Sequence, residues 1–320
     1  CLPLCEKMTC QSVVSAVLIG AALLLFSGCS SLAPITYPAN PSPLRLAVPY
    51  LPQDDFQCGP AAVAMVMDFH GGGVPLQTLT TEVYSPALRG SLQPALLAAG
   101  RRHGWLAWEI SDFAAILQEV AAGRPVIILQ NRGLSWKPVW HYAVVVGFDA
   151  AKGLIYLTSG REEQRAVATR TVLKTWERGG RWGLLLLPSG VLPVIADPDR
   201  LLAALAGLER SDAVVARSGY AAAVARWPAH AGLSTGYGNL LRKAGEPAAA
   251  EAAYRAALAG EPRHVPALNN LADLLLELDR LDEAYAAAVA AVAVDGPYHA
   301  TAAATLREIE RARGLPPGQP

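Results

Sequence analysis

One cysteine and one histidine have the residue types and surroundings of a nucleophile and its base. Cys58 stands in the run Gln-Cys-Gly-Pro at positions 57–60, directly before the apolar residues 61–69. A thiol in the first turn of a helix faces the positive end of the helix dipole and unpaired N–H groups, which favour thiolate, and Pro60 suits such a turn. Gly71 to Gly73 then stop the helix. The alternative is that Cys58 is a small buried apolar residue.

A thiolate nucleophile needs a base within hydrogen-bond reach, and imidazole is the usual one. His141 is the candidate, because it begins a β-branched run at 141–148 beside the tryptophans at 136 and 140. The alternative is a buried core histidine. The remaining histidines lie near helix ends or in the repeats described below: His70, His103, His230, His264 and His299.

The elements around this pair mix helix and strand patterns. The segment 44–190 predicts helices first and an antiparallel sheet second, which indicates an α+β fold. Ser111 is a plausible N-cap for one of the helices. The predicted helices cover 58–69, 91–104 and 111–123, and the predicted strands cover 125–130, 141–148, 154–158, 166–173 and 182–187.

The second half of the chain repeats with a fixed period. Pro228 and Pro262 stand 34 residues apart, and Gly296-Pro297 follows at the same interval. Small and aromatic residues keep this phase, which resembles the tetratricopeptide repeat; an alanine-rich bundle without repeats is the alternative. We expect three units, the first degenerate, and a capping helix at 300–313. Such arrays bind peptides or proteins on a concave surface.

The first residues resemble an export signal. Residues 13–26 are an apolar stretch of about 14 residues, short for a membrane span but typical of a signal peptide. The sequence Leu-Phe-Ser-Gly-Cys at 25–29 resembles a lipobox, in which Cys29 would carry lipid. An ordinary signal peptide or a buried helix is the alternative. The true start is expected at Met8, and Ser30 implies sorting to the outer membrane, facing the periplasm.

Composition excludes several classes of function. Lys plus Arg equals Asp plus Glu, at 27 each, so the charge gives no sign of nucleic-acid binding. The histidines are scattered, and no spacing for a metal site or a phosphate loop occurs, so we expect no metal and no cofactor. The expected division is a signal peptide at 1–28, a lipidated tether at 29–43, an α+β domain at 44–190, a linker at 191–196, repeats at 197–313 and a disordered tail at 314–320.

The chemistry-bearing blocks resemble one known family. Gln53, the run 57–62 and the run 141–149 are similar to the bacteriocin-processing (double-glycine) type of papain-like cysteine peptidase, closest to its lipoprotein branch with a tetratricopeptide tail. The resemblance implies helices packed on an antiparallel sheet, with Cys58 as nucleophile and His141 as general base and acid. It also implies that Gln53 helps to hold the oxyanion. The gap from Gln53 to the cysteine is one residue shorter than usual, so Gln57 stays an alternative.

The residue that orients the histidine is where this sequence departs from that family, which has an aspartate. Asp149 lies eight strand residues from His141, roughly 26 Å at about 3.3 Å per residue, so it cannot orient the imidazole and suits a turn instead. Folding a hairpin about Ala151 brings residues 159–161 opposite His141. Ser159 then occupies the aspartate position, with Arg161 beyond it, and would stabilise imidazolium less than a carboxylate.

These observations predict a lipid-anchored cysteine peptidase of the bacterial envelope that hydrolyses peptide bonds through an acyl-enzyme, with repeats that recruit a peptide or protein. The membrane would be reached through the lipid alone, and no nucleic acid is expected. The alternative is a catalytically weak or silent scaffold that binds partners through its repeats. A third class, an amide-forming or transamidating enzyme, shares the acyl-enzyme step.

Overall fold

The structure is a computed structural model that describes residues 35–38, 42–52, 56–160 and 162–314. The chain divides into two compact units, Cys1–Thr36 and Tyr37–Pro320. Cys29, the predicted signal peptide and the last six residues lie outside the described part, and so do Gln53 and Arg161. The predicted domain boundaries stay predictions.

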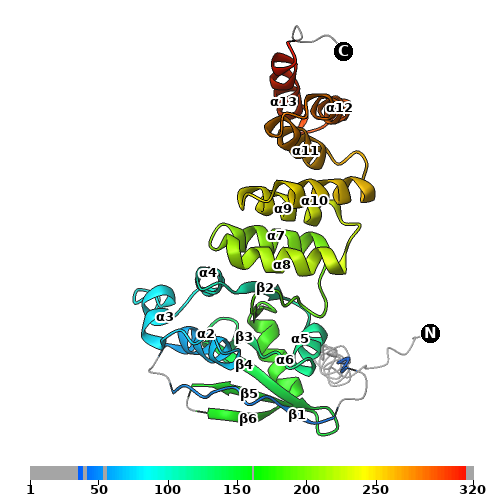
Figure 1. Ribbon diagram of the computed structural model, residues 1–320. Coiled ribbons are helices and arrows are strands. Elements are labelled where there is room, and N and C mark those ends of the chain that lie inside the picture. Colours follow the sequence, from blue (N-terminus) through cyan, green and yellow to red (C-terminus); the bar gives the residue numbers. More distant parts are fainter. Residues whose placement is uncertain (1–34, 39–41, 53–55, 161, 315–320) are drawn as a thin grey trace, which may run out of the picture. The chain divides into compact units, whose positions relative to one another are not determined.

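An antiparallel sheet forms the centre of the first part of Tyr37–Pro320 (Figure 1). Its edge-to-edge order is β2-β7-β3-β4-β5-β6, and the short β1 pairs with the far half of β4. The strands are β1 (Leu44–Arg45), β2 (Leu106–Ile110), β3 (Val126–Asn131), β4 (Trp140–Asp149), β5 (Leu154–Ser159), β6 (Glu162–Ala168) and β7 (Gly183–Leu187).

Five helices accompany this sheet. Helix α2 packs against β3, β4 and β5. Helices α5 and α6 both contact β3, and a ring contact between Phe113 of α5 and Trp176 of α6 joins them. The helices are α2 (Cys58–Phe69), α3 (Leu76–Val83), α4 (Gln93–Arg102), α5 (Phe113–Ala121) and α6 (Thr169–Arg178). The predicted α+β architecture is therefore confirmed.

Helix α2 is buried on all sides along residues 59–67, where its sequence is apolar throughout. Every residue from Gly59 to Met67 is buried, which matches the continuous apolar run in the sequence. The helix ends at His70, and Gly71 follows with a φ of 80°, a left-handed conformation that glycine adopts without strain. This burial fixes the first residue of the helix, Cys58, against the sheet.

Two local predictions were wrong. Ser111 is not the N-cap of α5: Asp112 is, and its carboxylate accepts the N–H of Ala114 at 3.2 Å. Residues 166–173 do not form a strand, because β6 ends at Ala168 and α6 begins at Thr169. Val172, Leu173 and Trp176 recur at helical spacing and are buried, so burying them favours helix over strand.

Part of the predicted tether packs on the sheet. The Tyr37 hydroxyl lies 3.0 Å from the Thr169 hydroxyl, and the Tyr37 ring contacts Phe148 of β4. Leu46 also donates its N–H to Val146 at 2.7 Å. Tyr37, which the sequence analysis assigns to the tether, is thus attached to the sheet.

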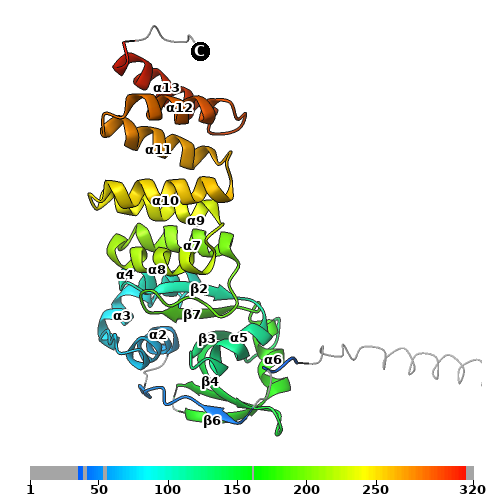
Figure 2. The same cartoon turned by 45° about the vertical axis from the view of Figure 1, so that its right-hand side comes forward.

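The remaining helices form antiparallel pairs that follow one another along the chain (Figure 2). Gly238 allows close packing, since a Cβ there would lie 2.6 Å from the Tyr254 ring, as expected for the small position of a tetratricopeptide repeat. The predicted repeats and capping helix are confirmed as α7 (Pro198–Glu209), α8 (Ala213–Arg226), α9 (Ala231–Lys243), α10 (Pro247–Gly260), α11 (Val265–Glu277), α12 (Leu281–Val292) and α13 (His299–Ala312).

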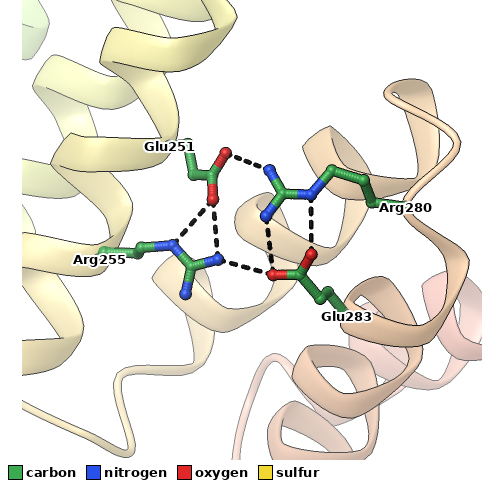
Figure 3. A network of polar contacts seen from close by, with 4 residues as sticks. All are labelled: Glu251, Arg255, Arg280 and Glu283. Carbon is green, nitrogen blue, oxygen red and sulfur yellow. Dashed lines mark hydrogen bonds and ion pairs between the residues drawn. The ribbon is translucent and has the colours of Figure 1, made fainter.

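A network of four charged side chains joins successive repeats. Glu251 and Arg255 of α10 form ion pairs with Arg280 and Glu283 at the start of α12 (Figure 3). Each arginine contacts both carboxylates, so the network specifies the register of one repeat on the next. Exposed pairs of this kind contribute to geometry more than to stability.

Candidate active site

The candidate site lies where the start of α2 meets the start of β4. The backbone N–H of Tyr142 donates to the Cys58 sulfur at 3.5 Å. Because the Tyr142 nitrogen is bonded to the carbonyl carbon of His141, the structure brings Cys58 and His141 together. Helix α2 supplies the sulfur at its first residue, and β4 supplies the imidazole at its second.

Pairing between β3 and β4 fixes the position of His141. His141 lies opposite Gln130, and Tyr142 lies opposite Leu129. Pairing between β4 and β5 begins at Val144, which lies opposite Thr158. The residues of β4 before Val144 pair with no described residue of β5. The Tyr142 N–H therefore remains available to the sulfur.

Ser159 lies beside the imidazole of His141, at the position that the sequence predicts. Its hydroxyl lies 2.9 Å from His141 Nε2, and Ser159 itself is buried at the end of β5. If Nε2–H donates to Ser159, the lone pair of Nδ1 is free to take a proton from a thiol. Asp149 lies at the far end of β4, where its carboxylate accepts the N–H of Lys152 in a turn at 3.0 Å.

Arg132 adds a positive charge to this group. Its guanidinium donates to the Ser159 hydroxyl at 3.5 Å. The Arg132 charge also acts on both members of the pair: it opposes part of the rise that burial causes in the pKa of Cys58, and it adds to the fall that burial causes in the pKa of His141. A cation thus lies beside the residue that takes the place of the family's aspartate.

The resting pair is neutral. Burial raises the pKa of the Cys58 thiol above its ordinary value, and the backbone N–H groups of Tyr142, Cys58 and Gly59, together with Arg132, oppose this only in part. Burial, and after it the charge of Arg132, lowers the pKa of His141 to about 3. The start of α2 was expected to favour thiolate, but the loss of solvent around the sulfur outweighs that effect.

The oxyanion side of the site is described in part. Gln53, the first choice for an oxyanion donor, lies outside the described residues. Gln57 is the N-cap residue of α2, and its side chain makes no capping hydrogen bond there. The N–H groups of Cys58 and Gly59 at the helix start face the sulfur, where they act to lower the pKa of the thiol.

A pocket of about 670 Å³ opens beside Cys58. Segments from five regions of the chain line it, and most of its side chains are apolar or basic. Its lining residues are Phe56, Cys58, Leu88, Arg89, Gly90, Ser91, Leu92, Gln93, Leu129, Trp140, Tyr142, Arg178, Gly179 and Gly180. The volume is in the range of sites for small ligands or short peptide segments.

Ser91 connects this pocket to the start of α2. A Cβ on Gly59 would lie 2.7 Å from the Ser91 hydroxyl, so only glycine allows α2 to begin this close to the 84–92 segment. The Ser91 carbonyl accepts the Tyr142 hydroxyl at 3.1 Å. Ser91 thus touches both residues that flank the sulfur.

Among the described residues, no group of His, Cys, Asp and Glu side chains is placed to bind a metal ion. A helix of sufficient length and apolarity to cross a membrane is likewise absent from the described ranges.

Comparison with known proteins assigns the first part of the chain. Residues 45–183 match the family model described as the Peptidase_C39 like family. This segment is similar to the C39-like peptidases. The predicted resemblance to double-glycine peptidases is thereby confirmed. A search of the curated proteins finds no match.

Solved structures resemble each part of the chain separately. A double-glycine-motif protease from an AMS/PCAT transporter, solved with its leader peptide, is 22% identical over 46% of this chain and 98% of that one, with a TM-score of 0.36. A C39-like peptidase from Bacillus anthracis is 17% identical over 46% and 98%, with a TM-score of 0.38. PilF from Pseudomonas aeruginosa is 25% identical over 37% of this chain and about half, 54%, of its own, with a TM-score of 0.34.

Sequence reasoning missed Arg132, which is the first residue after β3. Its N–H donates to the carbonyl of Val139 at 2.8 Å, which continues the hairpin that pairs Gln130 with His141. That hairpin is the signal that could have found Arg132. The pocket residues Ser91 and Arg178 had no such signal, because the 84–92 segment and the end of α6 are brought to Cys58 only by tertiary folding.

Proposed function

We propose that the C39-like domain is a cysteine peptidase in which Cys58 is the nucleophile and His141 the general base and acid. The observation that supports this most is the 3.5 Å approach of the Tyr142 N–H to the Cys58 sulfur, which places the imidazole-bearing residue next to the thiol in the family's chain order. The adjacent pocket gives a substrate access to the sulfur.

The reaction begins from the neutral pair. As the sulfur attacks the peptide carbonyl, Nδ1 of His141 takes the thiol proton, and the new C–S bond produces a tetrahedral oxyanion. The N–H of Cys58 and the side chain of Gln53, or of Gln57, donate to this oxygen. The C–N bond then breaks, and the imidazolium gives its proton to the leaving amine.

Water completes the cycle. His141 takes a proton from water as its oxygen attacks the thioester, and the C–S bond breaks to release the acid. The proton then returns from the imidazolium to the sulfur. In both halves, a hydrogen bond from Nε2–H to the Ser159 hydroxyl would leave Nδ1 as the nitrogen that carries the proton to and from the sulfur.

We further propose that Cys29 carries a lipid and that the protein lies in the bacterial envelope, at the outer membrane facing the periplasm. The lipobox-like sequence before Cys29 supports this anchor. The repeats would recruit a peptide or protein, as such arrays do in other proteins. A Cys29→Ser variant that stays in the membrane fraction after cell lysis would contradict the anchor.

A weakly active or silent scaffold is the second candidate. The specific observation in its favour is that a neutral serine contacts His141 Nε2, with a cation rather than an anion beside it. Burial, and after it the charge of Arg132, lowers the pKa of His141 to about 3, and a neutral hydroxyl does not oppose this shift as a carboxylate would. Such a site can persist for binding alone.

Mass spectrometry of envelope peptides separates the two candidates. Cells that carry the wild-type chain are compared with cells that carry Cys58→Ala. A peptidase leaves uncut precursors in the variant, and these identify the substrate. An unchanged peptide set, with equal protein levels in both strains, would favour the scaffold.

A further inference from the structure

The pocket beside Cys58 has an unusual charge. Its two charged lining residues, Arg89 and Arg178, are both basic, and none of the described residues that line it is Asp or Glu. Across the whole chain acidic and basic residues are equal in number. The excess of positive charge is therefore local to the pocket.

Arg178 has hydrogen-bonding capacity left for a ligand. Its Nε and Nη2 donate to the carbonyl of Asn131, at 3.3 and 3.1 Å. These two hydrogen bonds to one oxygen fix the plane of the guanidinium at the end of β3, while its Nη1 makes no hydrogen bond to another of the described residues. A planar, fixed guanidinium is suited to a carboxylate.

Arg89 is placed on the 84–92 segment of the same pocket. Its guanidinium stacks on the Phe56 ring, with 4.2 Å to the ring centroid. Both Arg89 and Phe56 adopt a positive φ, of 47° and 68°, which non-glycine residues adopt at a cost. The stacked pair keeps a second cation and an aromatic face at the pocket.

Exposed apolar side chains accompany these cations. Leu88 is 59% exposed, Leu92 54% and Trp140 57%, although all three line the pocket. Leu134 and Trp136, in the hairpin that leads to Trp140, are exposed as well. Apolar groups gathered in this way are typical of a surface that is covered by a partner.

We propose that this pocket selects peptides that carry a carboxylate next to an apolar side chain, and that Arg178 binds the carboxylate. The occupant follows from charge complementarity, since two cations and no acid line the pocket, and from the exposed apolar residues beside them. This inference rests on the proposed peptidase function and names its substrate class.

The test uses the full chain and a synthetic library of peptides of equal length and randomised sequence. The library is made with free and with amidated C-termini, and cleavage products are identified by mass spectrometry. We expect Asp or Glu to be enriched about tenfold at one fixed position relative to the cut bond, the effect of one charged hydrogen bond. Cleavage that needs the free terminus would instead assign the carboxylate to the peptide end.

Variants of Arg178 make the assignment. Arg178→Gln should abolish the enrichment, and Arg178→Lys, which keeps the charge, should retain part of it. Arg170→Gln is the matched control, because Arg170 is exposed on the same helix and does not line the pocket. Thermal melting of each variant shows whether the loss of the Asn131 contact has disturbed the fold. If Arg178→Gln unfolds, the acidic enrichment of Arg178→Lys is compared with that of the wild type, and an unchanged enrichment would overturn the assignment to Arg178.

The outcomes distinguish the two proposals. Cleavage without acidic enrichment, or enrichment that survives in Arg178→Gln, would overturn the carboxylate site and leave the peptidase intact. If the wild type cuts nothing, the peptidase proposal fails, and retention of the same library on the Cys58→Ala protein decides the inference. Acid-enriched retention that Arg178→Gln removes would support it, and unselective retention would overturn it.

Discussion

Replacing Ser159 by aspartate tests whether the missing carboxylate limits this site. The Ser159 hydroxyl lies 2.9 Å from His141 Nε2, so an aspartate at this position can accept the same N–H and add a negative charge. The charge stabilises the imidazolium and with it the thiolate–imidazolium pair. Ser159→Asn has the same shape without the charge, and is the matched control.

The size of the effect follows from the hydrogen bond that is exchanged. A neutral hydrogen bond contributes about 1 kcal/mol and one to a charged group about 1.5–3 kcal/mol, so the exchange is worth about 1.5 kcal/mol. This corresponds to a rise of about one unit in the pKa of His141 and about a tenfold larger population of the ion pair. The Arg132 guanidinium, 3.5 Å from the Ser159 oxygen, will pair with the new carboxylate and reduce this gain.

Alkylation of Cys58 by iodoacetamide at pH 6 measures the effect without a known substrate. The rate is followed on the peptide that contains Cys58, because the full chain has four other cysteines. We expect Ser159→Asp to react about tenfold faster than Ser159→Asn. Equal rates in two folded variants would refute the idea that the charge at this position controls the pair.

Three further predictions follow from the same geometry. Gly59→Ala should lower the free energy of unfolding by about 1–3 kcal/mol and slow alkylation of Cys58, because the new methyl group collides with the Ser91 side chain. Adding Ser91→Gly removes that side chain and should restore both quantities. Urea unfolding of the double variant checks this, and a double variant as unstable as Gly59→Ala would contradict the contact. Arg132→Gln should slow alkylation of Cys58 at pH 8, because loss of the cation raises the pKa of the thiol; a faster reaction would be inconsistent with its charge acting on the sulfur. Burial, and after it the charge of Arg132, lowers the pKa of His141 to about 3, so between about pH 6.5 and pH 3 the imidazole binds a proton in the unfolded chain but not in the folded one. The free energy of unfolding therefore decreases as the pH is lowered below about 6.5. Urea unfolding at pH 7 and pH 4.5 should show that His141→Gln loses up to about 2.5 kcal/mol less than wild type, and equal losses would argue against a buried neutral imidazole.

The parts of the fold that follow from local patterns could be predicted. The all-apolar run after Cys58, the β-branched run after His141 and the 34-residue period each specify an element by themselves. The strand assigned to 166–173 failed because its apolar residues suit either structure, and packing against β3 decided for α6. The short β1 and the strand β2 were missed, since neither has a repeating pattern of useful length.

In the candidate site, too, the features set by local sequence patterns could be predicted, and those set by tertiary packing could not. Ser159 opposite His141 was predictable, because a hairpin of known turn position fixes which residues meet. The protonation states were not, since they depend on how much water the folded chain removes from two particular side chains. The sequence shows a thiol at a helix start, but only the packing of α2 on the sheet shows that burial exceeds the effect of the dipole.

In the proposed peptidase, a neutral Ser159 beside His141, with Arg132 next to it, would favour one step of hydrolysis over the other. A cation near the sulfur stabilises thiolate and so assists attack on the carbonyl. The same cation disfavours imidazolium, the acid that must protonate the leaving amine. Attack and expulsion therefore place opposite demands on Arg132, and expulsion of a poor leaving group such as an amine becomes the difficult step.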